Sequence, residues 1–496
     1  METLLPGVSR SLQLIRTSEV DDAPALDQKA SLCGPLKWMM RRHWIRRTSE
    51  VDDAPALDQK ASLCGIMSIT VDVHLLSGKR ASMQLEANSS VESLKHRART
   101  ALASTGRLLN SSGQVLDGAQ TVTEAKLRSG DVLTLHVNQI QLKATKDSGM
   151  SSSAFAAILC DGSAVTWGRA DYGGDCNAVQ DQLRDVQQIQ ASGRAFAAIL
   201  VDGSVVTWGR ADYGGDSSVV QEQLRDVQQI QANEYAFAAI LGDGSVVTWG
   251  DADYGGDSSA VQVQLRHVQQ IQASARAFAA ILVDGSVVTW GNSGDGGDCS
   301  VVQDQLRDVQ QIQATEYAFA ATLGDGSVVT WGDARWGSDS SAVQQQLKNV
   351  QQIQASHAAF AAIRSDGSVV TWGDADYGGD SSAVQDQLRD VQQIQATEYA
   401  FAATLGDGSV VTWGDARWGG DSSAVQDQLK NVQQIQASDH AFAAILGDGS
   451  VVTWGNSDCG GDSSEVQDHL TNVQQIQASD AGIAAVLGDG ICSHLG

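Results

Sequence analysis

The octapeptide DGSVVTWG recurs every 41 residues, and this fixed period limits the possible folds more than any other feature of the sequence. The first copy has Ala164 in place of a Val, and the copies begin at Asp161, Asp202, Asp243, Asp284, Asp325, Asp366, Asp407 and Asp448. All eight Phe residues of the chain occupy one position of the same repeat. One unit of this length cannot bury its own apolar face, so units must pack on one another. The period therefore predicts a solenoid or a propeller.

The first half of each unit predicts a β-hairpin. In AFAAIL-x-DG-SVVTWG two apolar runs flank Asp-Gly, whose Gly tolerates the positive φ of tight turns. The second half, AVQDQLRDVQQIQ in the first unit, is ambiguous. Its apolar residues Val179, Leu183, Val186 and Ile189 are spaced four, three and three, as on an amphipathic helix. Periodicity alone would predict a strand-strand-helix solenoid.

The order of motifs resembles the repeat of the regulator-of-chromosome-condensation family. The likeness runs through G-x-V-x-x-W-G, a Gly-rich turn, a spaced Val and Leu, and V-x-x-I-x-A before AFAAIL. It implies four-stranded blades, so the second half of the unit is expected to form strands. The predicted fold class is mainly β, a multi-bladed β-propeller of seven or eight blades. These units are shorter than the family norm, and ADYGGDS or ARWGGDS replaces the loop of the family.

A terminal hairpin, GIAAVLGDGICSHLG, follows the eighth unit. The segment Val137 to Gln141 echoes VQQIQ and is a candidate for the missing outer strand of the ring.

The segment before the repeats has an α+β pattern. Alternating runs on both sides of Ser77 and Gly78 predict a hairpin, and Ser90 precedes a helix with Val91, Leu94, Ala98 and Leu102 on one face. RLLN, a Gly-rich turn and a final strand, DVLTLHV, complete the pattern. Through LLSGK, VESLK, RLLNSSGQVLDGAQTV and DVLTLHV it resembles a ubiquitin-like (β-grasp) domain. The resemblance places the partner-binding patch at Leu76, Leu109 and His136. Because NQIQLKAT follows where a conjugating protein would end in Gly-Gly, an integral recognition module is expected.

Residues 1–65 contain a direct duplication, RTSEVDDAPALDQKASLCG, at 16–34 and 47–65. Between the copies lies PLKWMMRRHWIRR, where cations alternate with Trp38 and Trp44. This segment suits a membrane surface or RNA, and the alternative is a disordered tail or a duplicated exon. The predicted domains are a disordered duplicated tail (1–65), a ubiquitin-like domain (66–138), a linker (139–153) and the repeat propeller (154–496).

Charge and cysteine usage narrow the partners and the compartment. The chain of 496 residues has a formal net charge of -26, which repels nucleic acid phosphates and disfavours an extended nucleic-acid interface. Its seven Cys residues show no metal spacing and no pairing pattern, which favours reduced thiols and a cytoplasmic or nuclear location. The sequence contains no run long and apolar enough to span a bilayer.

Catalysis is not expected. It requires unlike groups at one site, whereas near-identical units place like groups in a ring. The sequence contains no GxSxG, no P-loop and no HExxH, so we predict a protein that is not an enzyme and has no cofactor. The Asp after each Gly-Gly, as at Asp216, raises a calcium hypothesis, but turn formation explains Asp-Ser-Ser as well.

The places where the units differ are the better guide to binding. Two positions vary: the triplet before each Phe and the loop after each Trp-Gly. Both are expected at blade ends, where differing aromatic and charged side chains would form an uneven protein-binding surface, with drift in tolerant loops as the alternative. The candidate residues are Arg194, Tyr235, Arg276, Tyr317, Trp336, His357, Tyr399, Trp418 and His440.

The predicted function is therefore a non-enzymatic protein-interaction scaffold or adaptor that links a propeller-bound partner to the ubiquitin system. By resemblance, one alternative is a guanine-nucleotide exchange factor or regulator of a small GTPase. Another is a relative of propeller-bearing E3 ubiquitin ligases that lacks the catalytic domain. A repeat protein without a fixed partner is a further possibility.

Overall fold

The computed structural model describes residues 68–75, 79–86, 88–102, 107–114, 116, 118, 120–136, 141–145, 154–159, 161–479, 482–487 and 492–494. The predicted tail, 1–65, lies outside these residues, as does Leu76.

Each repeat builds one three-stranded antiparallel sheet. In a representative unit β8 (Val186–Ala191) pairs with β9 (Ala195–Leu200), which pairs with β10 (Val205–Gly209). Gly203 in the turn between β9 and β10 has a φ of +80°, as the Asp-Gly signal predicts. The hairpin prediction is confirmed, and VQQIQA is a strand and not the helix that periodicity alone favours.

The fourth strand implied by the resemblance is not formed in the repeats that the structure describes. After β10 the chain makes a short 3-10 helix, η2 (Ala211–Tyr213), and then a run of turns that ends at Leu224. The helix-like apolar spacing arises because Val220 and Leu224 of this run pack into the same core as Val227 and Ile230 of the next strand. The Gly-rich loop and the turns take up the residues that an outer strand would need, which is why the predicted four-stranded blades are wrong.

The described residues contain nine such sheets, each in the order first, second and third strand. The first eight are β5 (Gln141–Ala144), β6 (Ala154–Ile158), β7 (Ala164–Gly168); β8, β9, β10; β11 (Val227–Ala232), β12 (Ala236–Leu241), β13 (Val246–Gly250); β14 (Val268–Ala273), β15 (Ala277–Leu282), β16 (Val287–Gly291); β17 (Val309–Ala314), β18 (Ala318–Leu323), β19 (Val328–Gly332); β20 (Val350–Ala355), β21 (Ala359–Arg364), β22 (Val369–Gly373); β23 (Val391–Ala396), β24 (Ala400–Leu405), β25 (Val410–Gly414); and β26 (Val432–Ala437), β27 (Ala441–Leu446), β28 (Val451–Gly455). The ninth is β29 (Val473–Ser479), β30 (Gly482–Leu487), β31 (Cys492–His494).

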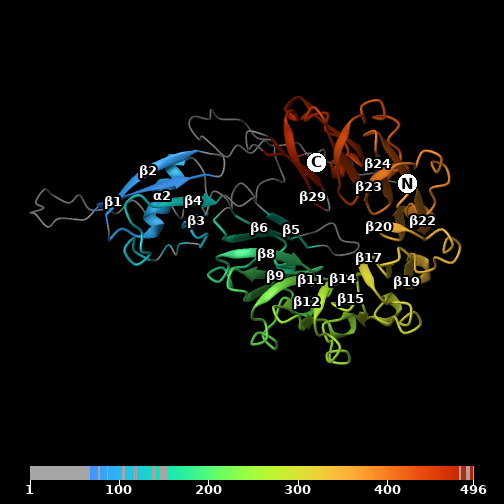
Figure 1. Cartoon of the computed structure of the whole chain (residues 1–496), viewed down its shortest axis with the longest axis horizontal. Coiled ribbons are helices and arrows are strands. Elements are labelled where there is room, and N and C mark those ends of the chain that lie inside the picture. Colours follow the sequence, from blue (N-terminus) through green and yellow to red (C-terminus); the bar gives the residue numbers. More distant parts are fainter. Residues whose placement is uncertain are drawn as a thin grey trace, which may run out of the picture.

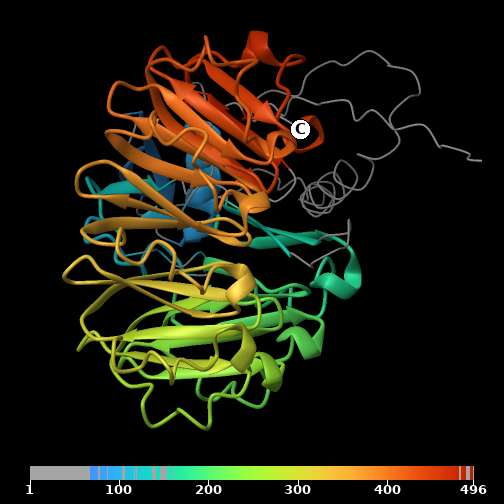
Figure 2. The same ribbon diagram turned by 90° about the vertical axis from the view of Figure 1, so that its right-hand side faces the viewer.

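The sheets follow one another around a ring, with the first strand of each sheet nearest the centre (Figure 1). Each first strand contacts the next, and β29 returns to contact β5, which closes the ring. Seen from the side, the strands run from one face of the ring to the other (Figure 2). This architecture is mainly β and consistent with a multi-bladed propeller.

The count of seven or eight blades is wrong, because the terminal hairpin belongs to a sheet of its own and does not complete one of the first eight. The eighth repeat supplies β29, and β30 and β31 pair with it as a complete ninth sheet. At the other end β5, within the segment predicted to be a linker, pairs with β6 as the first strand of the first sheet. Of the segment 137–141, predicted as an outer strand, only Gln141 is described, and it begins β5, which is the first strand of its sheet and lies next to β8 and β29.

The invariant Trp and Phe form the joints between sheets. Phe237 and Trp249 stack within one unit at 5.3 Å between ring centroids. The Trp249 indole N–H donates to the Gly214 carbonyl of the preceding unit, 3.0 Å away, and the same bond recurs from Trp208 to Trp454. Both rings are at least 95% buried, so each unit closes the core of the one before it.

The α+β unit before the ring has one sheet and one long helix. Its sheet order is β2 (Arg80–Glu86), β1 (Ser68–His74), β4 (Val132–His136), β3 (Arg107–Leu109), with β1 and β4 parallel. Helix α2 (Val91–Leu102) begins at Ser90, whose Oγ accepts from the Ser93 N–H, and buries the four apolar residues that the sequence placed on one face. The elements occur where predicted, and assignment to the ubiquitin-like family stays a prediction.

Among the residues that the structure covers, no helix has the length and apolar character needed to cross a lipid bilayer.

Candidate functional site

Both variable positions of the repeat lie at the same end of the strands. The triplet precedes the second strand and the loop follows the third, and the first residue of the triplet ties the two together. Ser192 Oγ donates to the Tyr213 carbonyl at 2.8 Å, and Thr315 Oγ1 donates to the Trp336 carbonyl at the same distance. Asn233 does the same through its side-chain amide. This anchor fixes the loop beside the triplet in each unit.

The second residue of each triplet joins neighbouring units through the backbone. The Gly193 N–H donates to the Glu234 carbonyl, and the Glu234 N–H donates to Ala275. The series continues through Glu316, His357 and Glu398 to Asp439, with N–O distances between 2.7 and 3.1 Å. Because these backbone groups bond to one another, the residues at this position differ between units without breaking the series.

Side chains from the loops and the triplets alternate around this face in one continuous series of contacts. Arg194 lies over the rings of Tyr172 and Tyr213, and Arg276 lies over Tyr254 and Tyr317. Ring contacts join the remaining members. We call this series the aromatic arc, and it comprises Tyr172, Arg194, Tyr213, Tyr235, Tyr254, Arg276, Tyr317, Trp336, His357, Tyr377, Tyr399, Trp418 and His440.

One irregular unit shows how the aromatic arc stays continuous. The third residue of its triplet is Ala358, which offers no ring. The preceding residue, His357, takes that place, with its ring centroid 5.0 Å from Trp336 and 5.6 Å from Tyr377. Apart from the fully buried Tyr172, the members are half-buried, so most present part of a ring or guanidinium to solvent.

Inside the aromatic arc, the triplets and the ends of the first strands line a cavity of about 660 Å³ on the ring axis. Four acidic residues belong to its lining: Glu234, Glu316, Glu398 and Asp439. We call these four residues and this cavity the acidic mouth. Glu316 and Glu398 have only 10% and 16% of their side chains exposed, so their carboxylates lie deep in it. A volume of this size is typical of small-ligand pockets.

Two histidines pair with these carboxylates. His357 Nε2 lies 2.5 Å from Glu316 Oε2, and His440 Nε2 lies 3.5 Å from Glu398 Oε2. The neighbouring Cys459 and Glu398 raise the pKa of His440 to about 9, so this ring is protonated at neutral pH. The geometry thus places a cationic imidazole, that of His440, next to the Glu398 carboxylate.

The pKa values of three tyrosines next to the acidic mouth are raised. Burial, followed by the charge of Glu234, raises the pKa of Tyr235 to about 12. Burial and the charge of Glu316 raise the pKa of Tyr317, and burial and Glu398 raise that of Tyr399. The negative potential therefore extends from the carboxylates over the aromatic arc.

The nine candidates predicted on the repeats all belong to the aromatic arc. The sequence missed its four loop tyrosines and the carboxylates as site residues, because the neighbourhood of a loop and the next unit's triplet cannot be read from spacing. The loop tyrosines could have been found from the sequence, because their position varies between units, where it is Tyr, Trp, Asp or Cys. Leu109 is half-buried on β3, His136 ends β4, and Leu76 lies outside the described residues, so the ubiquitin-like patch stays a prediction.

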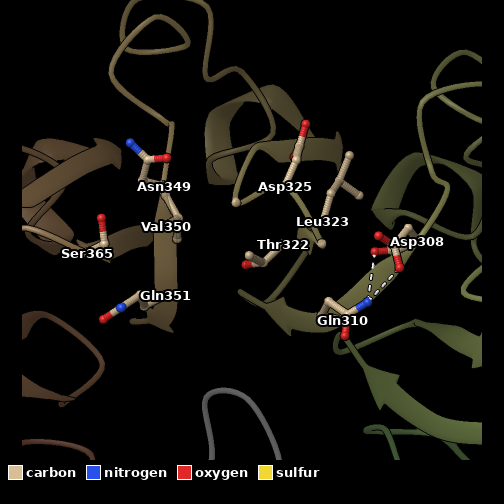
Figure 3. A pocket seen from close by; sticks show the side chains of 11 residues that line it. Asp308, Gln310, Thr322, Leu323, Asp325, Asn349, Val350, Gln351 and Ser365 are labelled. Carbon is tan, nitrogen blue, oxygen red and sulfur yellow. Dashed lines mark hydrogen bonds between the residues drawn. The ribbon is translucent and has the colours of Figure 1, made fainter.

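The opposite face is different in kind. A groove of about 570 Å³ lies there between neighbouring sheets, with Asp308 and Gln310 on one side and Asn349 and Gln351 on the other (Figure 3). Gln310 Nε2 donates to Asp308 Oδ1 at 2.8 Å. Asp308 and Asn349 occupy the left-handed region, as one residue does at this place in every unit described from Asp185 on. This groove follows the repeat, so we read it as part of the scaffold.

The Asp after Gly-Gly closes a turn. Asp216 Oδ1 accepts from the Ser218 N–H at 2.9 Å, and the same bond recurs at Asp257 and Asp421. Within the described part of the chain, no three His, Cys, Asp or Glu side chains are grouped so as to hold a metal ion.

No protein-family profile and no curated protein matches the chain. Solved structures with some likeness include Prp20p from Saccharomyces cerevisiae, at 13% identity and a TM-score of 0.36, covering 72% of this chain and 92% of that one. The CRINKLY WD40 ectodomain of the Arabidopsis thaliana receptor kinase ACR4 has 15% identity and a TM-score of 0.33, covering 55% and 96%. Human WBSCR16 has 14% identity and a TM-score of 0.33, covering 65% and 89%. At these scores the architecture rests on the sheet topology of the chain itself.

Proposed function

We propose that this protein is a non-enzymatic interaction scaffold that recognises a protein partner with the face formed by the aromatic arc and the acidic mouth. The observation that carries the proposal is where the repeats vary. Residues that repeat closely form the core, and the Tyr and Trp residues that differ between units gather in one series around one opening. The opposite face also varies, as from Val201 to Gly242 and from Asp308 to Asn349, but these changes bring no ring together there in the described residues. Half-buried Tyr, Trp and Arg side chains are the types enriched at protein-binding hot spots.

A binding role accounts for the chemistry of this face better than catalysis does. The Glu316–His357 pair has a carboxylate and an imidazole but no nucleophile among its described contacts, and the flanking rings cover both. The Glu398–His440 pair does have a thiol beside it, since Cys459 Sγ lies 3.6 Å from His440 Nδ1, but no other unit has a Cys at that loop position. The alternation of units places similar groups at several points of the opening. Such an arrangement suits an extended partner that touches many points.

Affinity purification of the full chain and two matched variants tests the proposal. The first variant, Tyr235→Ser, Tyr399→Ser and Trp418→Ser, removes three rings from the aromatic arc. The control, Val219→Ser, Val263→Ser and Val301→Ser, removes three exposed apolar side chains elsewhere. Proteins bound by the wild type should fall about tenfold with the first variant, which corresponds to about 1.4 kcal/mol, and stay unchanged with the control. Equal recovery by all three forms would overturn the proposal.

The link to the ubiquitin system is a further part of the proposal, carried by the resemblance of the α+β unit. We expect this unit to add ubiquitin-system components to the purified set. A chain lacking residues 68–137 should lose those proteins and keep the partners of the ring. Recovery of the same proteins by both forms would remove the link and leave the scaffold proposal standing.

Regulation of a small GTPase is the competing function, suggested by resemblance to the chromosome-condensation regulator. It makes a separate prediction, namely faster nucleotide release from a GTPase in the presence of the full chain. Acceleration that the three ring substitutions abolish would replace the scaffold by a regulator acting through the same face.

A further inference from the structure

The acidic mouth is matched by one segment of the same chain. Residues 35–47, PLKWMMRRHWIRR, contain five Lys or Arg, one His and two Trp, and no acidic residue, in a protein whose net charge is -26. In this segment Lys and Arg residues are interspersed with two Trp residues. In the acidic mouth and the aromatic arc, carboxylates lie next to aromatic rings. Charge and aromatic character are therefore complementary between the two.

We propose that residues 35–47 bind across the acidic mouth, with Arg or Lys side chains directed to its carboxylates and Trp side chains packed on the aromatic arc. The inference goes beyond the proposed function and does not depend on it, because it concerns the chain's contact with itself. Its consequence is that an external partner of this face competes with the segment.

The aromatic arc already shows how it holds a guanidinium. Arg194 lies 4.9 Å from the Tyr172 centroid and 4.8 Å from that of Tyr213, and Arg276 lies 5.1 Å from that of Tyr317. These distances are within the range of cation-π attraction. On the arc from Trp336 to His440 the guanidinium of Arg417 lies 5.9 Å from the Trp418 centroid, and three of the four carboxylates, Glu316, Glu398 and Asp439, come from the triplets along this part of the ring.

The connecting chain is long enough for this contact. The α+β unit packs on the far side of the ring, since Arg107 Nη2 donates to the Val186 carbonyl at the start of β8, so the segment has to pass around the rim. Between Arg47 and Ser68 the chain can span about 70 Å when extended. A compact domain of about 350 residues, the size of the ring, has a radius of gyration of about 20 Å. The span of about 70 Å exceeds this radius, so the segment can reach around the rim of the ring.

Peptide binding tests the inference with the full chain. The probe is the synthetic peptide PLKWMMRRHWIRR, labelled for fluorescence anisotropy. The peptide is added to a full-length variant, the receiving chain, in which Lys37, Arg41, Arg42, Arg46 and Arg47 are each replaced by Gln. These changes remove the positive charge of its own segment, so that the segment no longer competes for the acidic mouth. We expect the peptide to bind this chain about tenfold more tightly than the wild type, where the tethered segment competes.

A matched pair of variants in that receiving chain separates the site from general charge. Glu234→Gln, Glu316→Gln and Glu398→Gln should weaken peptide binding about tenfold. Asp181→Asn, Asp304→Asn and Asp386→Asn remove three fully exposed carboxylates and should change it less than twofold. Equal weakening by both sets would overturn the inference, because it would show nonspecific attraction to an acidic protein.

A second measurement reads the contact within the intact chain. Lys37 is the only Lys of the segment, so carbodiimide coupling followed by peptide mapping should join it to a carboxylate of the acidic mouth in the wild type. The same treatment of the Glu→Gln variant should leave it uncoupled there. Binding of residues 35–47 to RNA or to anionic vesicles, together with no coupling to the mouth, would assign the segment to those surfaces instead.

Discussion

A glycine pair follows the Trp-Gly in every full unit but one, and its two positions tolerate side chains differently. Gly214 has a φ of +87°, and a Cβ there would lie 2.5 Å from the Phe237 ring of the next unit. Gly215 has no positive φ, and its Cβ would meet the Gly209 backbone at 2.5 Å. One unit has Ser338 at the second position, where its N–H lies 3.3 Å from the Asp333 carbonyl, compared with 2.9 Å at Gly215. A small backbone shift therefore accommodates a side chain at the second position.

Substitution of this pair should give unequal effects. Gly214→Ala should destabilise the ring by about 2–4 kcal/mol, because it combines a positive φ with a clash against a buried ring. Gly215→Ser should cost no more than about 1 kcal/mol, since the unit with Ser338 already adopts that arrangement. Thermal unfolding followed by circular dichroism measures both. A larger loss for Gly215→Ser would show that the backbone shift at Ser338 depends on other features of its unit.

Among the elements, the short 3-10 helices place different side chains on the face of the aromatic arc in different units. The helix that follows each Trp-Gly ends in a left-handed Gly, whether its last residue is Tyr213, Asp295, Trp336 or Cys459. The eighth of them, η8 (Ser457–Cys459), places a thiol where most of the others place an aromatic ring. Cys459 Sγ lies 3.6 Å from His440 Nδ1, and Glu398 holds the other side of the imidazole. This element is therefore a pH-sensitive part of the face.

The stability of this part should depend on pH through His440. Its pKa is raised from 6.5 to about 9 in the folded chain, so the stabilisation is complete below pH 6.5 and disappears as the pH rises through 9. The melting temperature of the wild type should exceed that of His440→Gln by a few degrees at pH 6, and the difference should vanish near pH 10. A constant difference would mean that ring packing on Trp418 and Tyr399, and not charge, determines the role of His440. Cys459→Ser should reduce the pH dependence without removing it.

At the scale of the molecule, two basic residues hold the α+β unit against the ring. Arg107 Nη2 donates to the Val186 carbonyl at 3.0 Å, and Arg99 Nη2 lies 3.6 Å from Asp161 Oδ2. Burial alone would raise the pKa of Asp161, but the Ser163 hydrogen bonds and the charge of Arg99 lower it. The Arg107 guanidinium also fills the space next to Gly162, where no Cβ would fit. This packing fixes the unit on the face opposite the acidic mouth.

Removing Arg107 should separate the two parts. In Arg107→Ala, amide exchange at residues 161–163 should rise about tenfold, equivalent to about 1.4 kcal/mol of local stability, and small-angle scattering should give a larger radius of gyration. Arg128→Ala, an exposed arginine of the same unit, serves as the control and should change neither value. Unchanged exchange in Arg107→Ala would show that other contacts hold the units together.

The period, the hairpin and the α+β element order were predictable because they depend on neighbours in sequence. The nine-fold closure was not, since it depends on the angle between packed sheets, and neither was the replacement of a fourth strand by turns. Of the site, the sequence identified Arg194, Tyr399 and the other varying residues of the repeats, because variation is visible in one chain. It could not show that Tyr377 and Glu316 accompany them.

The sequence by itself determined what each unit is: a hairpin with a Trp and a Phe that must pack on the next copy, and a few positions that do not repeat. Only the tertiary structure decided what those positions do together. The curl of the ring brings the loop of one unit beside the triplet of the next, so that Trp336 meets His357. Local spacing specifies strands and turns, whereas the meeting of side chains from separate units follows from the rotation between sheets, which arises from the packing of all of them.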